Sequence, residues 1–219
     1  MRKLIVGAFT SLDGVMQAPG GPEEDPIGGF SFGGWAAPYF DETMGAEVGE
    51  LFSAPFDLLL GRKTYDIFAA HWPYAKPDDP IGPLFDRINK YVATRNRGFE
   101  TNWQNSHILG ADAVEAVRQL KREDGPNLLT QGSTDFLKTL FAHGLVDEIN
   151  VYVFPILLGR GKRLFGDASQ PTALKLVSSK TTASGITANR YVPSGAVTTG
   201  SFEFEQPTEA ELARRKNLT

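Results

Sequence analysis

The chain has 219 residues, no cysteine and a formal net charge of −4 at pH 7. This length fits one domain of ordinary size, and the acidic balance argues against a nucleic-acid surface as the main function. Without cysteine, disulfides, thiolate nucleophiles, Cys-ligated zinc and iron–sulfur clusters are excluded. His71, His107 and His143 lack metal-ligand spacing, so we predict no metal site. Met1–Thr10 is too short for a signal peptide and no apolar run approaches ~18 residues, which predicts a cytoplasmic protein.

The first predicted element is a strand over Leu4–Phe9, which ends in the turn Ser11-Leu12-Asp13-Gly14. By local chemistry alone, Asp13-Gly14 is a β-turn pair. Residues 17–38 then form a segment rich in Gly and Pro that is longer than most connections in compact domains. Three large rings interleave with the glycines and favour an ordered lid, because a flexible linker gains nothing from apolar rings. These rings belong to Phe30, Phe32 and Trp35.

A helix is predicted over Tyr39–Ser53, because four apolar residues recur on one face. They are Phe40, Met44, Val48 and Leu51. Glu47 falls on the same face, where burial would raise its pKa and suit it to donate a proton. The alternative is that Glu47 lies at the open end of the apolar stripe and reaches water. Asp41, at the edge of the stripe, is the second candidate for the acidic group.

Phe56–Leu60 are a continuous apolar strand, and Gly61 leads directly into the next helix. The first turn of that helix carries Arg62, Lys63 and Thr64. Cations oppose the dipole at a helix N-terminus, so an anion is expected to offset them. Free N–H groups bind any phosphate, whereas two neighbouring cations favour an additional dianion. This pattern favours NADPH over NADH as the cofactor.

A second strand, glycine and helix sequence occurs in the stretch from Asn127 to Gly166. Leu128–Thr130 are a short apolar strand, Gly132 allows a tight turn, and Ser133 or Thr134 can cap the helix that follows. A helix N-terminus beside the carboxyl end of a strand binds anions. The alternative reading is ordinary helix capping, and Asp135 would repel a pyrophosphate unless it points away.

The remaining elements complete an α/β pattern. Tyr91–Thr94 form a third short strand, closed by Arg95, and Ala113–Arg122 an amphipathic helix that we expect to cover the sheet. Glu148–Phe154 return as a strand after the Gly132 turn and its helix. Further strands are predicted at Ala173–Ser178 and Ile186–Val192, which alternate as an antiparallel pair, with one more possible at Ser201–Glu205. We therefore predict one domain over residues 1–205 and a polar tail over 206–219, with a possible short helix.

Three motifs in order resemble the dihydrofolate reductase-like family that includes the riboflavin-biosynthesis reductase domain. They are TSLDG at Thr10–Gly14, LLLGRKTYD at Leu58–Asp66, and QGS followed by a helix and GLVDEINVYVFPILLGRGKRLF. The resemblance spans roughly residues 3 to 192. It implies a three-layer α/β fold with a mostly parallel central sheet, helices on both faces and a C-terminal antiparallel hairpin.

The resemblance also implies functional residues. It places the Asp13 turn at the start of a mobile loop beside the nicotinamide, and Thr94 and Arg95 beside the adenosine end of the cofactor. The first helix after the lid carries the acid that faces the substrate, but no motif shows which acid matches, so Glu47, Asp13 and Asp41 stay candidates. The predicted cofactor-binding residues are Gly61, Arg62, Lys63, Thr64, Thr94, Arg95, Gln131, Gly132, Ser133 and Thr134.

The loop Gly159-Arg160-Gly161-Lys162-Arg163 has neither G-x-G-x-x-G nor the GK[ST] ending of a P-loop, so we interpret it as a basic hairpin loop. In the family this loop follows the substrate-side strand, so Arg160 or Lys162 could meet an acidic or phosphorylated substrate.

The predicted reaction is hydride transfer from NADPH to a C=N or C=O bond of a small heterocyclic or sugar-like substrate. Alternatives are the riboflavin-pathway reduction of a ribosylamino-pyrimidine phosphate, folate reduction, and a nucleotide-binding dimer without turnover. The long aromatic 17–38 segment and the pair Gln131-Gly132, where the family has two glycines, make folate reduction less favoured. Members of the family are typically dimers, so a homodimer is expected.

Overall fold

A computed structural model describes residues 1–166, 170–202 and 206–218. Within these residues the strands form one eight-stranded sheet in the order β4-β3-β2-β5-β1-β6-β8-β7. Neighbours from β4 to β6 are parallel, while β8 is antiparallel to both β6 and β7. The strands are β1 (Leu4–Ser11), β2 (Phe56–Gly61), β3 (Lys90–Ala93), β4 (Ser106–Ile108), β5 (Asn127–Thr130), β6 (Glu148–Phe154), β7 (Leu174–Thr181) and β8 (Thr187–Pro193). The predicted α/β sheet with a C-terminal antiparallel hairpin is confirmed.

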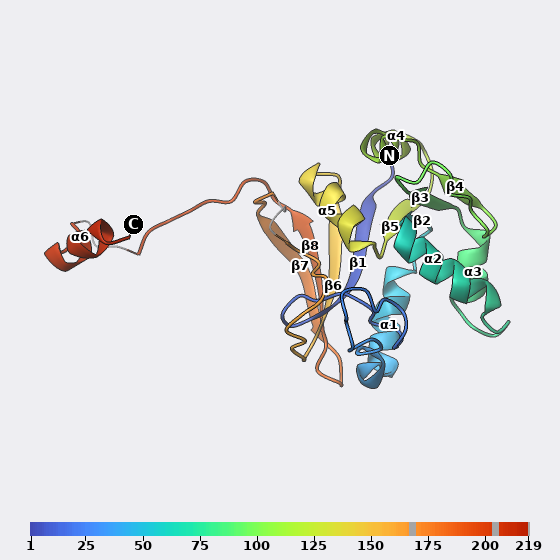
Figure 1. Cartoon of the computed structure of the whole chain (residues 1–219), viewed down its shortest axis with the longest axis horizontal. Helices are drawn as coiled ribbons and strands as arrows, with labels where there is room; N and C mark the ends of the chain where they lie inside the picture. The colour runs from blue at the N-terminus through green and yellow to red at the C-terminus, as the bar shows by residue number, and fades with distance from the viewer. Residues whose placement is uncertain (167–169, 203–205, 219) are drawn as a thin grey trace.

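Helices cover both faces of this sheet (Figure 1). The α-helices are α1 (Glu42–Leu51), α2 (Arg62–His71), α3 (Gly82–Arg87), α4 (Ala113–Arg122), α5 (Thr134–Ala142) and α6 (Glu209–Lys216), and Ala37–Tyr39 and Trp72–Tyr74 are short 3₁₀ turns. The apolar faces of α4 and α5 pack on one side of the sheet, with the even-numbered residues of β1. On the other side α1 and the 17–38 lid cover one half of the sheet, and α2 and α3 cover the other.

The burial of the strands follows from this layering. Every residue of β2 is buried, as expected for a parallel strand that is covered on both faces. At the edge of the sheet, β7 is exposed along almost its whole length. Helix α6 lies at the end of an extended C-terminal segment, apart from the sheet (Figure 1). No helix among the described residues has the length and apolar character needed to cross a bilayer.

Several element boundaries differ from those expected. The helix predicted over Tyr39–Ser53 is shorter, because the Asp41 side chain accepts a hydrogen bond from the Met44 amide and caps α1 there. Helix α3 and strand β4 were not expected, since neither is long enough to show a periodic pattern. The possible strand at Ser201–Glu205 falls partly on residues 203–205, which lie outside the described ranges.

A buried ion pair joins the amino ends of the central strands. Arg2 pairs with Asp57, and both residues are almost fully buried. The Arg2 Nε also donates to the Pro126 carbonyl, at 2.5 Å, just before β5. The second oxygen of Asp57 accepts from the Asn89 amide at 3.1 Å, just before β3. The pair thus connects the segments that lead into β1, β5 and β3 with β2 itself.

We expect Asp57→Ala to lower the free energy of unfolding by about 3–5 kcal/mol, because it leaves the Arg2 guanidinium buried without a counter-charge. The matched control is Glu115→Ala, which removes the exposed partner of Arg122 and should cost less than about 1 kcal/mol. Urea unfolding monitored by circular dichroism measures both values. Equal losses in the two variants would contradict the role given to the buried pair.

Candidate active site

Two glycine turns meet at the carboxyl edge of the sheet. Strands β2 and β5 are parallel neighbours, so the turns that follow them lie side by side, and each leads into a helix. The Gly61 amide donates a hydrogen bond of 2.9 Å to the Gly132 carbonyl. This hydrogen bond holds the starts of α2 and α5 next to each other, as the repeated strand, glycine and helix pattern predicts. The Gly132-Ser133 peptide bond is cis.

Both glycines are required by this close approach. A Cβ on Gly61 would lie 2.4 Å from the Ser133 Oγ and 2.8 Å from the Ser133 amide nitrogen. A Cβ on Gly132 would lie 2.5 Å from the Thr64 Oγ1, and Gly132 has a φ of 149°, which L side chains rarely adopt. Any larger residue would separate the two turns.

The starts of both helices present amide groups that no side chain caps. Gly61 precedes α2 and has no side chain, and Ser133 precedes α5 without making a capping hydrogen bond. The first N–H groups of a helix need a partner, and together with the helix dipole they favour an anion. Two such starts in contact could each bind one phosphate of a pyrophosphate group.

The main cavity, of about 870 Å³, opens beside these turns. Its polar edge is formed by Lys63 and Thr64 of α2 and by the segment from Gln131 to Asp135. Its interior lies between α1 on one side and α2 and α3 on the other, over the face of β1. The walls there are largely apolar and carry several aromatic rings. They include Phe9, Val48, Phe52, Phe68, Trp72 and Phe85.

The lid (residues 17–38) closes one side of the main cavity. It is anchored by Trp35, which is buried, contacts the Phe154 ring edge-on and donates through Nε1 to the Gln17 carbonyl at 2.7 Å. The Gln17 side chain is also buried, and its Nε2 donates to the carbonyls of Asp25 and Ile27 at 2.8 and 2.9 Å. Gln17 therefore fixes the middle of the lid relative to its start.

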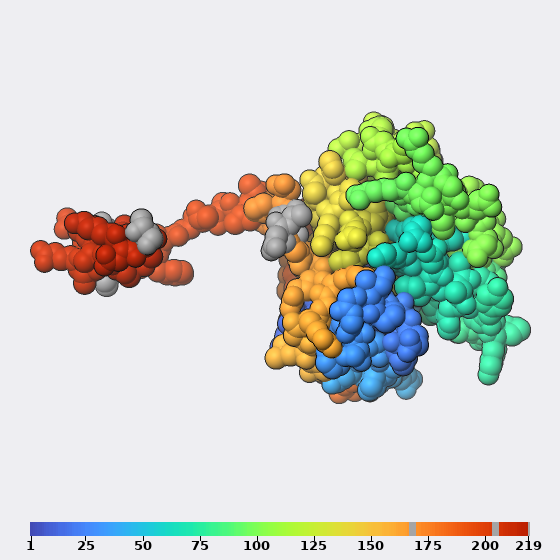
Figure 2. All heavy atoms as spheres, viewed as in Figure 1, coloured from blue at the N-terminus to red at the C-terminus, as the bar shows by residue number. Residues whose placement is uncertain are grey.

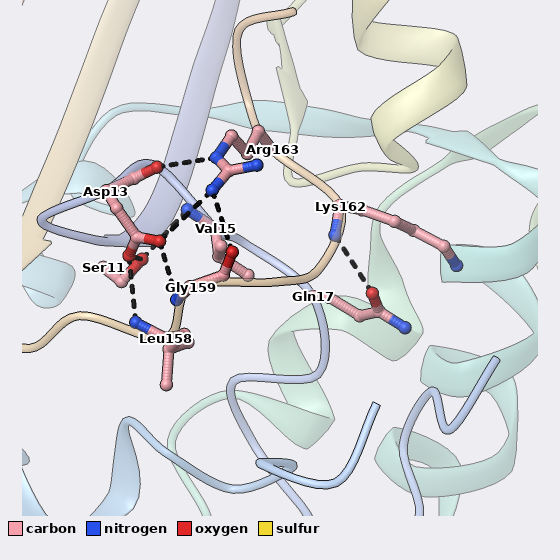
Figure 3. Close-up of polar contacts among 8 residues, drawn as sticks. All are labelled: Ser11, Asp13, Val15, Gln17, Leu158, Gly159, Lys162 and Arg163. Atoms are coloured by element: carbon pink, nitrogen blue, oxygen red, sulfur yellow. Dashed lines mark hydrogen bonds and ion pairs between the residues drawn. The ribbon is translucent and has the colours of Figure 1, made fainter. Parts of the chain in front are cut away.

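The basic loop (residues 159–163) holds the lid from outside, and the two lie against each other in Figure 2. The Gln17 Oε1 accepts from the Lys162 amide at 3.0 Å, and the Lys162 ammonium pairs with Asp25 (Figure 3 shows the first contact). Arg160 donates to the Ser31 hydroxyl at 2.9 Å. In this structure the cations that were expected to meet a substrate thus hold the lid, although Lys162 also lines the main cavity.

A model of the RibD C-terminal domain matches residues 2–188 of the chain. The chain belongs to the RibD C-terminal domain family. The Bacillus subtilis (strain 168) protein YyaP is 27% identical over 188 residues, which cover 84% of this chain and 92% of YyaP. The family model confirms the family expected from the three sequence motifs.

Solved structures show the same fold. A putative riboflavin biosynthesis protein from Shewanella sp. PV-4 superposes with a TM-score of 0.61 at 21% identity, covering 88% of this chain and 99% of that chain. Dihydrofolate reductase from Enterococcus faecalis, in complex with NADP(H) and RAB-propyl, superposes with a TM-score of 0.56 at 13% identity, covering 87% of this chain and 96% of that chain. This RibD C-terminal domain is thus dihydrofolate reductase-like in fold.

Asp13 stabilises a loop junction in this RibD C-terminal domain. Its carboxylate accepts from the amides of Leu158 and Gly159 at 3.0 and 2.9 Å and pairs with Arg163 at 3.3 Å (Figure 3). The hydrogen bond from the Ser11 hydroxyl and those from the two amides lower the pKa of Asp13 to about 2. A carboxylate with this pKa is ionised at neutral pH and holds no proton to donate.

Glu47 and Asp41 lie away from the main cavity. Glu47 pairs with Lys180 of β7 at 3.0 Å and lines a separate polar cavity of about 260 Å³. Glu47 was expected to share the apolar stripe of the helix and face the substrate. In the structure, Val48 of α1 lines the main cavity and Glu47 does not. Asp41 caps α1 and accepts from the Ser184 amide, and hydrogen bonds from Thr43, Met44 and Ser184 lower its pKa to about 2. A catalytic role for either remains a prediction that its position does not favour.

The predicted cofactor residues divide into two groups. Lys63, Thr64 and Gln131–Thr134 line the main cavity, with Gly61 directly beneath them. Arg62 does not line it and pairs instead with the exposed Asp66 at 2.5 Å. Thr94 and Arg95 follow β3, whose Ala93 is in register with Gly61, so they lie at the same edge of the sheet next to the α2 turn. No group of His, Asp or Glu in the described part of the chain is arranged to hold a metal ion.

Sequence analysis did not single out several of the residues that line the main cavity. Among them, Gln17 and Glu24 both belong to the lid. A glutamine in a loop carries no periodic signal, and Glu24 stands in the run Glu23-Glu24-Asp25, which resembles a solvated acidic loop. Only the packing of the lid on the cavity distinguishes them from surface residues.

We expect Gly61→Ala to lower the free energy of unfolding by about 1–3 kcal/mol, because the new methyl group must force the two turns apart. It should also weaken dinucleotide binding, since both helix starts would shift. Gly49→Ala is the matched control: nothing lies within 4 Å of a Cβ there, and in a helix this change should stabilise by up to about 1 kcal/mol. Urea unfolding of both variants checks the contrast. Equal stability would contradict the close contact.

Proposed function

We propose that this RibD C-terminal domain is an NADPH-dependent reductase that transfers a hydride to a C=N or C=O bond of a small heterocyclic substrate. The family match and the dihydrofolate reductase-like fold support a reductase of the riboflavin or dihydrofolate type. The observation that carries the proposal is the pair of uncapped helix starts at the Gly61 and Gly132 turns, which face one cavity.

The residues at the two turns fit a dinucleotide in separate roles. The amides at the start of α5, with Ser133 and Thr134, would bind one phosphate, and those at the start of α2, with Thr64, the other. Arg62 and Arg95 would favour a 2′-phosphate, because they lie at the same edge and guanidinium groups bind phosphate bidentately. When bound, the nicotinamide supplies the hydride. The lid would exclude water from the reacting atoms.

The walls of the main cavity favour a flat ring as the substrate. Aromatic side chains such as Phe52, Phe68 and Trp72 stack on planar rings and bury apolar area, but they offer a sugar few hydrogen bonds. A heterocycle therefore fits better than a sugar-like substrate. Reduction of the ribosylamino-pyrimidine phosphate of riboflavin biosynthesis remains an alternative, since Lys162 could meet its phosphate by leaving Asp25. Reduction of dihydrofolate is a further alternative.

A homodimer is part of the proposal. Strand β7 is an edge strand, and Leu174, Leu176 and Val177 on it are each more than two-fifths exposed. A long exposed edge with apolar side chains is a ready site for pairing with another chain. A nucleotide-binding dimer without turnover is the non-catalytic alternative.

The decisive experiment is a titration with NADPH followed by addition of a hydride acceptor. We expect NADPH to quench the fluorescence of the protein with saturation, and its absorbance to fall when a heterocyclic acceptor is added. Dihydrofolate and the ribosylamino-pyrimidine phosphate are the acceptors to use first. Saturable binding without oxidation of NADPH by any acceptor would favour the non-catalytic dimer, and absence of binding would contradict the proposal as a whole.

The choice of the phosphorylated cofactor has its own test. We expect Arg62→Glu to weaken NADPH binding by about tenfold or more, because a charged hydrogen bond to the 2′-phosphate is lost and a repulsion is added, while NADH binding changes little. Arg122→Glu, on the exposed face of α4, is the control for the change in net charge. Fluorescence titrations with both nucleotides give the ratio. Equal weakening of NADPH and NADH would remove the reason for preferring NADPH.

A further inference from the structure

The carboxyl groups of the main cavity differ in what they contact. Among the described residues, four of them line it: Glu23, Glu24 and Asp25 of the lid, and Asp135 of α5. Asp25 is paired with Lys162. Glu23 and Asp135 are exposed to solvent. Glu24 is partly buried, and the described residues give it no ion-pair partner.

One oxygen of Glu24 is held and the other is available. The Oε2 atom accepts from the Gly20 amide at 2.6 Å and from the Gly21 amide at 3.1 Å. No hydrogen bond from a described residue reaches Oε1. A carboxyl group that is fixed through one oxygen keeps the other in a defined place, where it can meet a ligand in the cavity.

The lid segment that carries Glu24 is itself well supported. The Gly34 amide donates to the Ala18 carbonyl at 2.9 Å, and the Ala36 amide donates to the Pro19 carbonyl at 3.1 Å. A Cβ on Gly33 would lie 2.5 Å from the carbonyl oxygens of both Gly21 and Pro22, so the two segments of the lid touch. Trp35 then anchors this pair of segments in the core. Glu24 therefore projects from a packed loop.

We propose that Glu24 is the proton donor of the reduction. The assignment rests on the proposed function and deepens it. In the balanced step, the carbon of the C=N or C=O bond would receive a hydride, and a bound reduced nicotinamide would supply it and be left oxidised. The nitrogen or oxygen of that bond takes the proton from the Glu24 carboxyl, which is left as a carboxylate. Solvent returns a proton to Glu24 when the product leaves.

The surroundings of Glu24 suit this role. Burial raises the pKa of Glu24 above that of an ordinary glutamate, against the opposing hydrogen bonds from Gly20 and Gly21. The neighbouring Asp25 raises it further, and His71 of α2 lowers it. Lys63 of α2 and Lys162 of the basic loop also line the cavity, and Lys162 is paired with Asp25. The donor is present below the raised pKa and is lost as the pH rises through it.

The first arm of the test needs no substrate. Carbon-13 NMR of protein labelled at the glutamate side-chain carboxyl follows each titration, and the Glu24 signal is the one that disappears in Glu24→Gln. We expect Glu24 to titrate at a higher pH than a glutamate in a short unstructured peptide, because burial raises its pKa. A midpoint equal to that of the peptide glutamate would overturn the assignment, whether or not the protein reduces any acceptor.

The second arm measures hydride transfer against pH with NADPH and whichever acceptor is reduced. Glu24→Gln keeps an oxygen that can accept from the Gly20 and Gly21 amides, so the lid should keep its shape. We expect the rate of hydride transfer in this variant to be lower by about 100-fold or more. The decrease in rate that the wild type shows as the pH rises through the pKa of Glu24 should be absent. The affinity of the variant for NADPH and its melting temperature should match those of the control Glu100→Gln, which changes an exposed glutamate outside the main cavity. A wild-type rate and pH profile in Glu24→Gln would overturn the proposal.

The two proposals fail in different ways. If NADPH does not bind or no acceptor is reduced, the proposed reductase function is wrong. The titration midpoint of the Glu24 carboxyl, measured by NMR, then still tests the assignment of Glu24 separately. If NADPH is oxidised normally by Glu24→Gln, the reductase function stands and only the assignment of Glu24 falls.

Discussion

The hydrogen bond from the Gly61 amide to the Gly132 carbonyl joins the two halves of the site. It can form only because β2 and β5 are parallel neighbours, so that their carboxyl ends reach the same edge of the sheet. The absence of side chains lets the two turns touch, and this contact brings two helix starts within reach of a single ligand. The polar part of the main cavity depends on this contact.

The opposite edge of the sheet serves stability. There the Arg2–Asp57 pair is buried and makes further hydrogen bonds to Pro126 and Asn89. A buried pair is strongly unfavourable to break, because each charge then lacks a partner. The buried ion pair and the two uncapped helix starts thus lie at opposite ends of the strands. The helix starts at the carboxyl edge can therefore stay uncapped without loosening the core.

The lid and the basic loop act as one unit across the mouth of the cavity. All three cations of the loop contact the N-terminal segment: Arg160 at Ser31, Lys162 at Asp25 and Arg163 at Asp13. Since the loop continues from β6, the position of the lid is set by the sheet and not by the lid sequence alone. The arrangement supports Glu24 and gives the cavity one of its walls.

Local sequence patterns predicted the two glycine turns, and the resemblance of three motifs to a known family implied the mostly parallel sheet. A strand, a glycine and an amphipathic helix are each encoded within a few residues, and two copies of that sequence occur at Gly61 and Gly132. The three aromatic residues Phe30, Phe32 and Trp35 likewise predicted from sequence that the lid is ordered. The acidic group was decided by tertiary structure alone. Periodicity places Glu47 on a helix face, but its partner is Lys180, 133 residues away, and Glu24 gains its buried position only because the lid folds over the cavity. The environment of a carboxyl group depends on contacts between distant segments, and these are not encoded in the residues beside it.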